Sequence, residues 1–280
     1  MAKPIMIQGT SSGVGKTILT IALCRIFKQD GYSVAPFKSQ NMTNNTAIIG
    51  SGEEIAVSQI LQAYAADVAP SAKMNPIVLK PLLDRQGTQL ISNGRSCGVI
   101  NAYNFKEIKK KLIPEIQNAY QLLASQYDII VIEGAGSPVE LNMSGDDIVN
   151  MGIAKLAHAP VLLVGDISRG GIFASLYGTV SLLDYKKYVQ AMVVNRFKGD
   201  LAWFAGGKVI LEKITGLPVA GIVPYMAFDL PEEDDLDTRG MQPFVSGGNY
   251  DCQIDFIAEV VRKSLNMELI YQILNQGIEA

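Results

Sequence analysis

Near its start the chain reads Gly9-Thr10-Ser11-Ser12-Gly13-Val14-Gly15-Lys16-Thr17, between a short apolar run and a stretch with helical spacing. Consecutive backbone N–H groups in such a loop surround phosphate oxygens, and the start of the following helix adds positive potential. In this arrangement Lys16 reaches the β- and γ-phosphates, and the Thr17 hydroxyl is offered to Mg²⁺. The stretch therefore predicts a P-loop, with an ordinary strand–helix turn as the alternative.

The spacing of this loop is unusual. From Gly9 to Gly15 there is one residue more than the usual motif allows, so Thr10 occupies the position of the first glycine. The residues expected to bind the nucleotide, ATP, are Thr10, Ser12, Gly13, Val14, Gly15, Lys16 and Thr17.

Short β-branched runs alternate with longer helical stretches, which is typical of a wound parallel sheet. The expected strands are Pro4–Gln8, Ser33–Phe37, Ile129–Glu133, Pro160–Gly165, Val189–Val194 and Val219–Val223. The expected helices are Lys16–Gln29, Glu53–Asp67, Phe105–Ser125, Asp147–Leu156, Ile172–Leu182 and Ala202–Thr215. Ile77–Ile91 is expected to be extended or an extra hairpin. The predicted fold class is α/β: a P-loop NTPase with a mostly parallel wound sheet and helices on both faces.

The sequence changes character after this pattern. Asp229–Gly248 is acidic and then glycine-rich, so it is expected to be a loop or linker. Cys252–Asn275 has helical spacing and forms either a helix that docks on the core or a contact for a partner. We therefore expect a P-loop domain over residues 1–237, followed by a linker and helical tail over 238–280.

An acidic residue ends the apolar strand Ile129–Glu133 and is followed by Gly134-Ala135-Gly136. P-loop enzymes place a carboxylate here to complete the Mg²⁺ shell, and the glycines let a loop approach the ligand closely. Glu133 is thus a candidate metal ligand, and a plain strand-end acid is the alternative.

Lys38-Ser39-Gln40-Asn41 follows the second expected strand, at the edge of the sheet where parallel sheets bind ligands. Lys38 there neutralises either a transferring phosphoryl group or a substrate carboxylate, unless it is a solvated surface lysine. Gln40 and Asn41 are candidate substrate contacts.

Two further strand ends carry polar residues. Asn195 offers a donor and an acceptor that match the adenine edge, although Asn also commonly starts turns. Asp166 and Arg169 follow another strand, and Arg169 either clamps a carboxylate or phosphate of the substrate or pairs with Asp166.

The composition argues against several classes of function. The net charge of −3 gives no basic footprint for nucleic acid or an anionic membrane, and the three cysteines have no metal-ligand spacing. No apolar run approaches the roughly 18 residues of a membrane span, and no charged-then-apolar signal region precedes the first strand. We therefore expect a cytoplasmic protein.

With these residues in view, roughly Pro4 to Asp237 resembles the ATP-dependent synthetase domain of cobyric acid synthase, within the wider dethiobiotin synthetase-like P-loop family. The resemblance rests on the P-loop and on Phe37–Met42, Glu54-Ile55, Gln59, Gln62-Ala63, Met74-Asn75-Pro76, Leu79-Lys80-Pro81, Ile132–Pro138, Asp147–Gly152, Asp166, Arg169–Gly171 and Val223-Pro224-Tyr225. It implies a ligase in cobalamin biosynthesis that activates corrinoid carboxylates with ATP as acyl phosphates for attack by ammonia.

The resemblance also assigns roles. It places Thr17, Glu54 and Glu133 around Mg²⁺, Lys16 and Lys38 on phosphoryl oxygens as catalytic groups together with Glu133, and Asn195 on adenine. Because relatives of this fold often pair near their active sites, a homodimer is compatible with it.

The resemblance departs at one point. Cobyric acid synthases carry a glutamine amidotransferase domain, and none of the three cysteines here lies in its Gly-x-Cys-x-Gly elbow. We expect ammonia to come from solution or from a separate glutaminase subunit. Two alternatives stay open: a dethiobiotin-synthetase-like ligase, and a nucleotide-switched partitioning ATPase. The second is disfavoured because such ATPases carry a lysine where this loop has Ser11.

Overall fold

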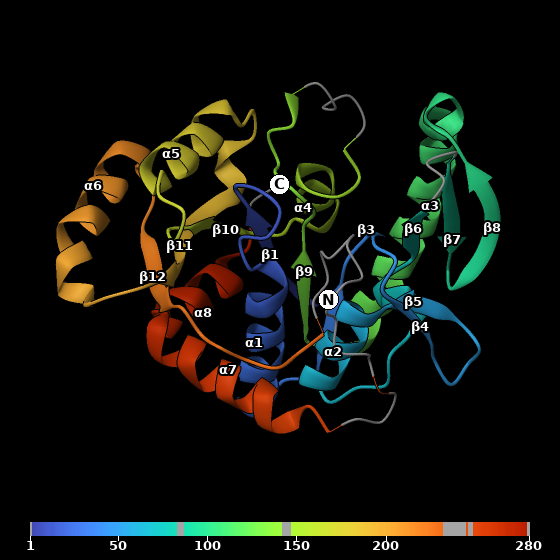
Figure 1. Ribbon diagram of the computed structural model, residues 1–280, viewed down its shortest axis with the longest axis horizontal. Helices are drawn as coiled ribbons and strands as arrows, with labels where there is room; N and C mark the ends of the chain where they lie inside the picture. The colour runs from blue at the N-terminus through green and yellow to red at the C-terminus, as the bar shows by residue number, and fades with distance from the viewer. Residues whose placement is uncertain (1, 83–86, 142–146, 232–244, 246–248, 279–280) are drawn as a thin grey trace.

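The computed structural model describes residues 2–82, 87–141, 147–231, 245 and 249–278. Its centre is a six-stranded sheet of order β12-β11-β10-β1-β9-β2, and all neighbouring strands in it are parallel (Figure 1). The strands are β1 (Lys3–Gly9), β2 (Val34–Phe37), β9 (Ile129–Glu133), β10 (Val161–Asp166), β11 (Val189–Phe197) and β12 (Val219–Pro224). The α/β class and the parallel sheet predicted from the sequence are confirmed.

Helices cover both faces of this sheet. One face carries α3 (Ala102–Gln126), α4 (Met151–Ala157), α5 (Ile172–Leu182) and α6 (Ala205–Thr215). The other carries α1 (Lys16–Gln29), α2 (Val57–Ala65), α7 (Asp251–Ser264) and α8 (Met267–Gln276). Short 3₁₀ turns lie at Ala72–Met74, Lys186–Tyr188 and Leu201–Phe204.

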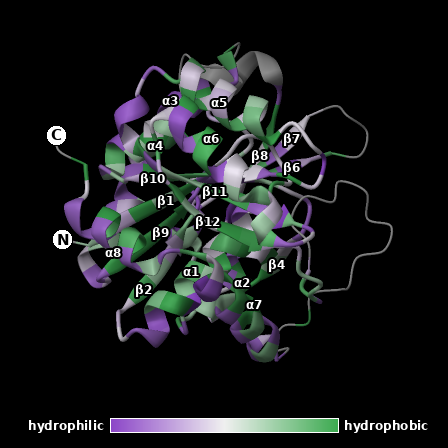
Figure 2. Cartoon of the chain, turned by 90° about the vertical axis from the view of Figure 1, so that its left-hand side faces the viewer, coloured by the Kyte–Doolittle hydropathy of each residue, from purple (hydrophilic) through white to green (hydrophobic). Residues whose placement is uncertain are grey.

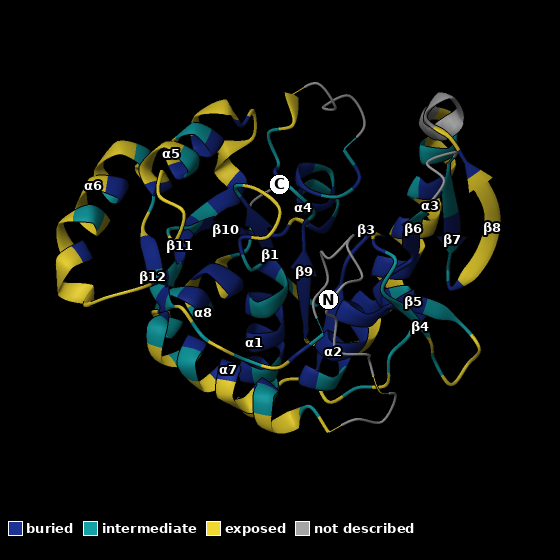
Figure 3. Ribbon diagram, in the orientation of Figure 1, coloured by how far each residue is buried: buried dark blue, intermediate teal, exposed yellow. Residues whose placement is uncertain are grey.

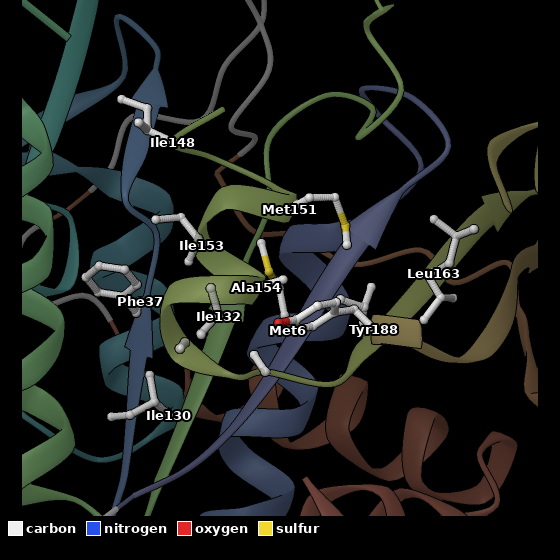
Figure 4. Packing of buried hydrophobic residues seen from close by; sticks show 14 of the residues in the cluster. Met6, Phe37, Ile130, Ile132, Ile148, Met151, Ile153, Ala154, Leu163 and Tyr188 are labelled. Atoms are coloured by element: carbon white, nitrogen blue, oxygen red, sulfur yellow. The ribbon is translucent and has the colours of Figure 1, made fainter. Parts of the chain in front are cut away.

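Alternation along the strands feeds two separate cores. Ile5 and Ile7 of β1 pack toward α1, whereas Met6 between them packs toward α4. Figure 4 shows Met6 beside Met151 and Ala154 of α4, and Figure 3 shows the central strands as buried. Figure 2 shows the same strands coloured mainly as hydrophobic. Both faces of the sheet are therefore dry, which explains why its strands are nearly continuous apolar runs.

A smaller sheet extends the fold beyond β2. Its order is β3-β6-β7-β8, where β3 (Gln40–Met42) and β6 (Ile77–Pro81) are parallel, and β7 (Thr88–Ser92) and β8 (Arg95–Ile100) continue it antiparallel. The extra hairpin expected around Ile77–Ile91 is thus present. A two-stranded ribbon of β4 (Thr46–Ile48) and β5 (Glu54–Ala56) lies beside it (Figure 1).

Several expected helices differ in their bounds: the one expected from Phe105 begins at Ala102, and the one expected from Ala202 begins at Ala205, after a 3₁₀ turn. The helix expected from Glu53 begins only at Val57, because Glu54–Ala56 pairs with β4 instead. The helix expected from Asp147 begins at Met151, because the Asp147 carboxylate accepts hydrogen bonds from the backbone N–H groups of Val149, Asn150 and Gly152 and holds a turn. The C-terminal tail also differs from its expectation.

The tail is two helices, not one. Leu265 bridges to Gly221 of β12, and the Asn266 backbone N–H donates to the Ala220 carbonyl, so the chain is extended between α7 and α8. The Asn266 side chain then caps α8 by accepting from the Leu269 N–H. Both helices contribute buried residues to the core on the α1 face. The expected boundary at 237/238 lies outside the described residues.

The topology fixes where a ligand site lies. The chain runs from β1 to β2 and β9 on one side, then crosses to β10 on the other side of β1. The strand order therefore reverses beside β1, which is where open parallel sheets form a crevice at their carboxyl edge. Over the described part of the chain, no helix has the length and apolarity needed to cross a membrane.

Candidate functional site

The P-loop joins β1 to α1 at this crevice. Gly13 and Gly15 have φ of 70° and 95°, in the left-handed region that favours glycine. A Cβ on Gly9 would lie 2.5 Å from Cγ2 of Val14, so the glycine required by packing is Gly9 rather than the residue after it. The Thr10 N–H donates to the Val164 carbonyl at 2.9 Å and ties the loop to β10.

Lys16 is buried and joins two loops. Its Nζ donates to the Ser11 carbonyl at 3.0 Å and to the Gly136 carbonyl at 3.3 Å, so it lies between the P-loop and the loop that follows β9. The positive charge of Lys16 is thus held at the mouth of the P-loop.

Glu133 is the centre of the polar network. It ends β9 in register with Ile7 of β1 and is buried. Its Oε1 accepts from the Thr17 hydroxyl at 2.9 Å and from Lys38 Nζ at 3.0 Å, and its Oε2 accepts from the Gln62 side-chain amide. A carboxylate, a hydroxyl and a lysine therefore meet beside the P-loop.

The pKa of a buried thiol is affected by this carboxylate. Burial raises the pKa of Cys24 on α1 well above its usual range, and the negative charge of Glu133 raises it further. Cys24 is therefore a neutral packing residue and not a nucleophile.

Asn150 holds the loop that follows β9. Its Nδ2 donates to the carbonyls of Ala135 at 2.7 Å and Ser137 at 3.2 Å, and its Oδ1 accepts from the Ala135 N–H. A Cβ on Gly134 would lie 2.3 Å from that Oδ1. The glycine after the strand-end acid is therefore required by contact with Asn150.

A cavity of about 860 Å³ opens over these groups. Its charged lining comprises Lys16, Lys38, Lys109, Lys155, Arg196, Glu133, Glu140, Asp147 and Asp184. Lys155 Nζ lies 3.2 Å from the centroid of the Tyr185 ring, which also lines the cavity. Cationic and acidic side chains thus line one cavity beside the P-loop.

The cavity brings together much of the site expected from the sequence. The expected residues that line it are Ser12, Gly13, Gly15, Lys16, Thr17, Lys38, Gln40, Asn41 and Glu133. Those that do not line it are Thr10, Val14, Glu54, Asp166, Arg169 and Asn195.

Glu54 is engaged elsewhere. Its Oε1 accepts from Lys80 Nζ of β6 and from the Thr46 hydroxyl of β4, each at 2.6 Å. Burial raises the pKa of Glu54, but these hydrogen bonds and the Lys80 charge lower it more, so that the carboxyl lies below its usual range. The structure does not bring Glu54 to Thr17 and Glu133 at the cavity.

Asp166 pairs with Arg196 and not with Arg169. Arg196 Nη1 lies 2.9 Å from Asp166 Oδ2, while Arg169 is exposed. Burial raises the pKa of Asp166, but hydrogen bonds from Ser168 and Arg196 lower it more. The pairing of Asp166 with Arg169, one of two alternatives considered from the sequence, is not formed among the described residues, because β11 with Arg196 lies directly beside β10.

Asn195 lies against the P-loop. Its Nδ2 donates to the Val14 carbonyl at 2.8 Å, and a Cβ on Gly15 would lie 2.2 Å from that nitrogen. One of its donors is thus used by the loop itself. Its expected role on adenine stays a prediction.

Sequence reasoning gave no role to Gln62, Asn150 or Arg196. Gln62 and Asn150 are amides within otherwise apolar segments, and such residues are buried only with partners. Arg196 follows Asn195 at a strand end and lines the cavity. A polar side chain at a position where the apolar pattern predicts a buried residue is the sequence feature that could have indicated Gln62 and Asn150.

The donor set suits a magnesium nucleotide. Mg²⁺ takes oxygen ligands and is usually held by one or two carboxylates together with phosphates, as Glu133 and Thr17 would allow. The described residues contain no group of three or more His, Cys, Asp or Glu side chains that could hold a metal ion. One carboxylate and one hydroxyl beside the P-loop fit a metal that binds together with phosphate oxygens.

A parallel sheet with a P-loop at its switch point and an acid at the next strand end defines a P-loop NTPase fold. Residues 5–236 match the family model described as CbiA, the CobQ/CobB/MinD/ParA nucleotide binding domain. The chain belongs to this family.

Curated relatives give a narrower likeness. The chain is 53% identical over 245 residues to cobyric acid synthase of Lachnoclostridium phytofermentans, covering 85% of this chain and 48% of that protein. It is 51% identical to cobyric acid synthase of Ruminiclostridium cellulolyticum, over 85% of this chain and 47% of that protein. The protein of that name from Listeria monocytogenes is 48% identical, over 86% and 47%. The chain thus spans about half the length of these relatives.

Proposed function

We propose that this chain is the ATP-dependent, amide-forming part of a cobyric acid synthase in cobalamin biosynthesis. The observation that carries the proposal is the arrangement at Glu133, where the Thr17 hydroxyl and Lys38 Nζ meet one carboxylate oxygen beside the P-loop. A carboxylate is a poor acylating agent, and phosphorylation supplies the leaving group that amide formation needs. The relatives at about 50% identity support this reaction over others on the same fold.

The first step is phosphoryl transfer. A carboxylate oxygen of the substrate attacks the γ-phosphorus of ATP, and the bond from phosphorus to the β,γ-bridging oxygen breaks to release ADP. The P-loop amides and Lys16 hold the phosphates, and Lys38 lowers the repulsion between the carboxylate and the phosphoryl group. Thr17 and Glu133 would hold Mg²⁺, which would neutralise charge at the phosphate oxygens.

The second step forms the amide. The ammonia nitrogen attacks the carbonyl carbon of the acyl phosphate, phosphate leaves with the bond electrons, and a proton is lost to give the neutral carboxamide. Water in the cavity would hydrolyse the intermediate, so the substrate must fill the space above Lys38. The ammonia comes from solution or from a glutaminase.

A corrinoid with several carboxylates is the proposed substrate. Gln40 and Asn41 on β3 line the cavity, and Asn41 is held by a hydrogen bond from its Nδ2 to the Ser58 hydroxyl. Gln40 Oε1 is buried, with no hydrogen-bond partner among the described residues. An acceptor left in this state favours a ligand that brings a donor, as an amide or ammonia does.

The family description alone leaves a partitioning ATPase open, because it also names MinD and ParA. Such a protein would hydrolyse ATP without regard to a small carboxylate. The difference defines the experiment.

The test is ADP release from Mg·ATP and ammonium, with and without adenosylcobyrinic acid a,c-diamide, followed by mass analysis of the corrinoid. We expect ADP release that depends on the corrinoid and matches stepwise conversion of acid to amide. ATP turnover that the corrinoid does not change, with an unaltered corrinoid mass, contradicts the proposal. Diaminopelargonic acid with bicarbonate then tests the dethiobiotin-synthetase-like alternative.

A further inference from the structure

Gln62 reaches the metal-binding carboxylate from a separate helix. It lies on α2 and is completely buried, and its Nε2 donates to Glu133 Oε2. Gln59, one turn earlier and equally buried, donates from Nε2 to Gln62 Oε1 at 2.8 Å. Two amides of one helix thus form a chain that ends on Glu133.

The charge of Glu133 fixes the direction of this chain. An ionised carboxylate only accepts hydrogen bonds, so Gln62 must turn its NH₂ group toward Glu133. Its carbonyl oxygen then faces Gln59, which must donate in turn. Gln59 Oε1 is left buried without a partner among the described residues. The fold keeps this unfavourable orphan, as expected if the contact with Glu133 is the one that matters.

The two oxygens of Glu133 have different surroundings. Oε1 faces Thr17 and Lys38 on the side of the P-loop, whereas Oε2 faces Gln62 of α2. The bond from Gln62 therefore fixes the rotation of the carboxylate about its last torsion angle. Without it, the carboxylate loses the donor at Oε2 that acts together with the bonds from Thr17 and Lys38 at Oε1.

We infer that Gln62 is a positioning residue, which orients Glu133 for a magnesium nucleotide. Partners of a metal-binding carboxylate that do not touch the metal still govern affinity, because they hold the ligand in the geometry that the metal needs. The inference rests on the Mg²⁺-binding role in the proposed function. Its effect is on Mg²⁺-dependent binding rather than on the P-loop amides.

The experiment compares Gln62→Met with Gln59→Met in nucleotide binding. Methionine has a similar length and lacks the N–H donor. The affinity for a non-hydrolysable ATP analogue is measured by calorimetry with Mg²⁺ and with EDTA, and the ratio of the two is the readout. We expect Gln62→Met to lower this ratio about tenfold or more, with binding in EDTA unchanged. Gln59→Met, equally buried but not touching Glu133, is expected to lower it less.

Each outcome either supports or overturns the positioning role of Gln62. An unchanged ratio in folded Gln62→Met overturns the inference, and so does an equal loss in both variants, which would mark a packing effect on α2. If Gln62→Met does not fold, Gln62→Asn replaces it, since its amide is one methylene too short to reach Glu133, and the same loss is expected. A wild-type protein whose binding ignores Mg²⁺ contradicts the proposed metal site itself, which keeps the two failures distinct.

Discussion

Lys38 and Glu133 form an ion pair in the interior, with Nζ 3.0 Å from Oε1 and side-chain exposures of 5% and 0%. They stand at the carboxyl ends of β2 and β9, which are neighbours in the sheet with Phe37 opposite Ile132. Two parallel strands that end together therefore bring the opposite charges together. Each charge can be buried because it is paired with the opposite charge of the other residue.

The pair predicts a strong coupling between the two residues. Lys38→Met leaves the Glu133 carboxylate buried without its cation, which should lower the free energy of unfolding by about 3 kcal/mol. Glu133→Gln in the same background removes the stranded charge, so the double variant should be less destabilised than the sum of the single variants. Urea unfolding without nucleotide measures all three. Strict additivity would show that the pair carries no coupling.

We predict that substitution of Lys16 lowers turnover, whereas substitution of Lys28 on the same helix does not. Lys16→Ala removes the charge at the P-loop and should lower corrinoid-dependent ADP release by about 10²-fold or more. Lys28 lies in the last turn of α1 and pairs with Asp67 on the surface, so Lys28→Ala should leave turnover within about twofold of wild type. Full activity in Lys16→Ala would remove this residue from phosphate binding.

Two glycines of the P-loop predict different costs for the same substitution. A Cβ on Gly13 meets nothing within 4 Å, so Gly13→Ala should cost only the backbone strain of about 1–2 kcal/mol. Gly15→Ala adds a clash with Asn195 and should therefore bind the ATP analogue more weakly and unfold at a lower temperature than Gly13→Ala. Asn195→Ala in the Gly15→Ala background should recover part of the loss. Equal losses of affinity and of melting temperature at both glycines would mean that Asn195 can move to make room for the added methyl group.

The core of the fold was predictable because its signals are local. The P-loop lies between a strand and a helix that adjoin it in sequence, and Glu133 ends a strand whose apolar run is unbroken. Since parallel strands share a carboxyl edge, Lys38 and Glu133 were expected near the P-loop without any knowledge of strand order.

What the sequence could not predict depends on distant contacts. Gln62 meets a residue 71 positions away, and nothing in its own helix indicates that partner. The β3–β8 region contains strands as short as three residues, which periodicity does not detect. The break at Leu265 between α7 and α8 has the same origin, because it forms where the chain touches β12.

Glu54 shows the same limit at the site itself. The resemblance places it near Mg²⁺, and the structure pairs Glu54 of β5 with Lys80 of β6. The role of Glu54 in binding Mg²⁺ stays a prediction. The ion pair with Lys80 leads to a separate prediction about stability and pH.

The pKa of Glu54 lies below its usual value of about 4.3. The ion pair therefore adds stability above that value, and this stability is lost as the pH falls through the lower pKa of the folded state. Glu54→Gln should lower the melting temperature at pH 7 by about 2–4 °C at most, since the pair is partly exposed and worth less than about 1 kcal/mol. The difference from wild type should shrink below about pH 4. Melting curves between pH 3 and pH 8 measure it, and a difference that grows toward low pH would contradict the pairing.

Calorimetry of the same variant tests the metal role of Glu54. A ligand of Mg²⁺ would also change the ratio of the nucleotide affinities measured with Mg²⁺ and with EDTA, whereas a partner of Lys80 alone would not.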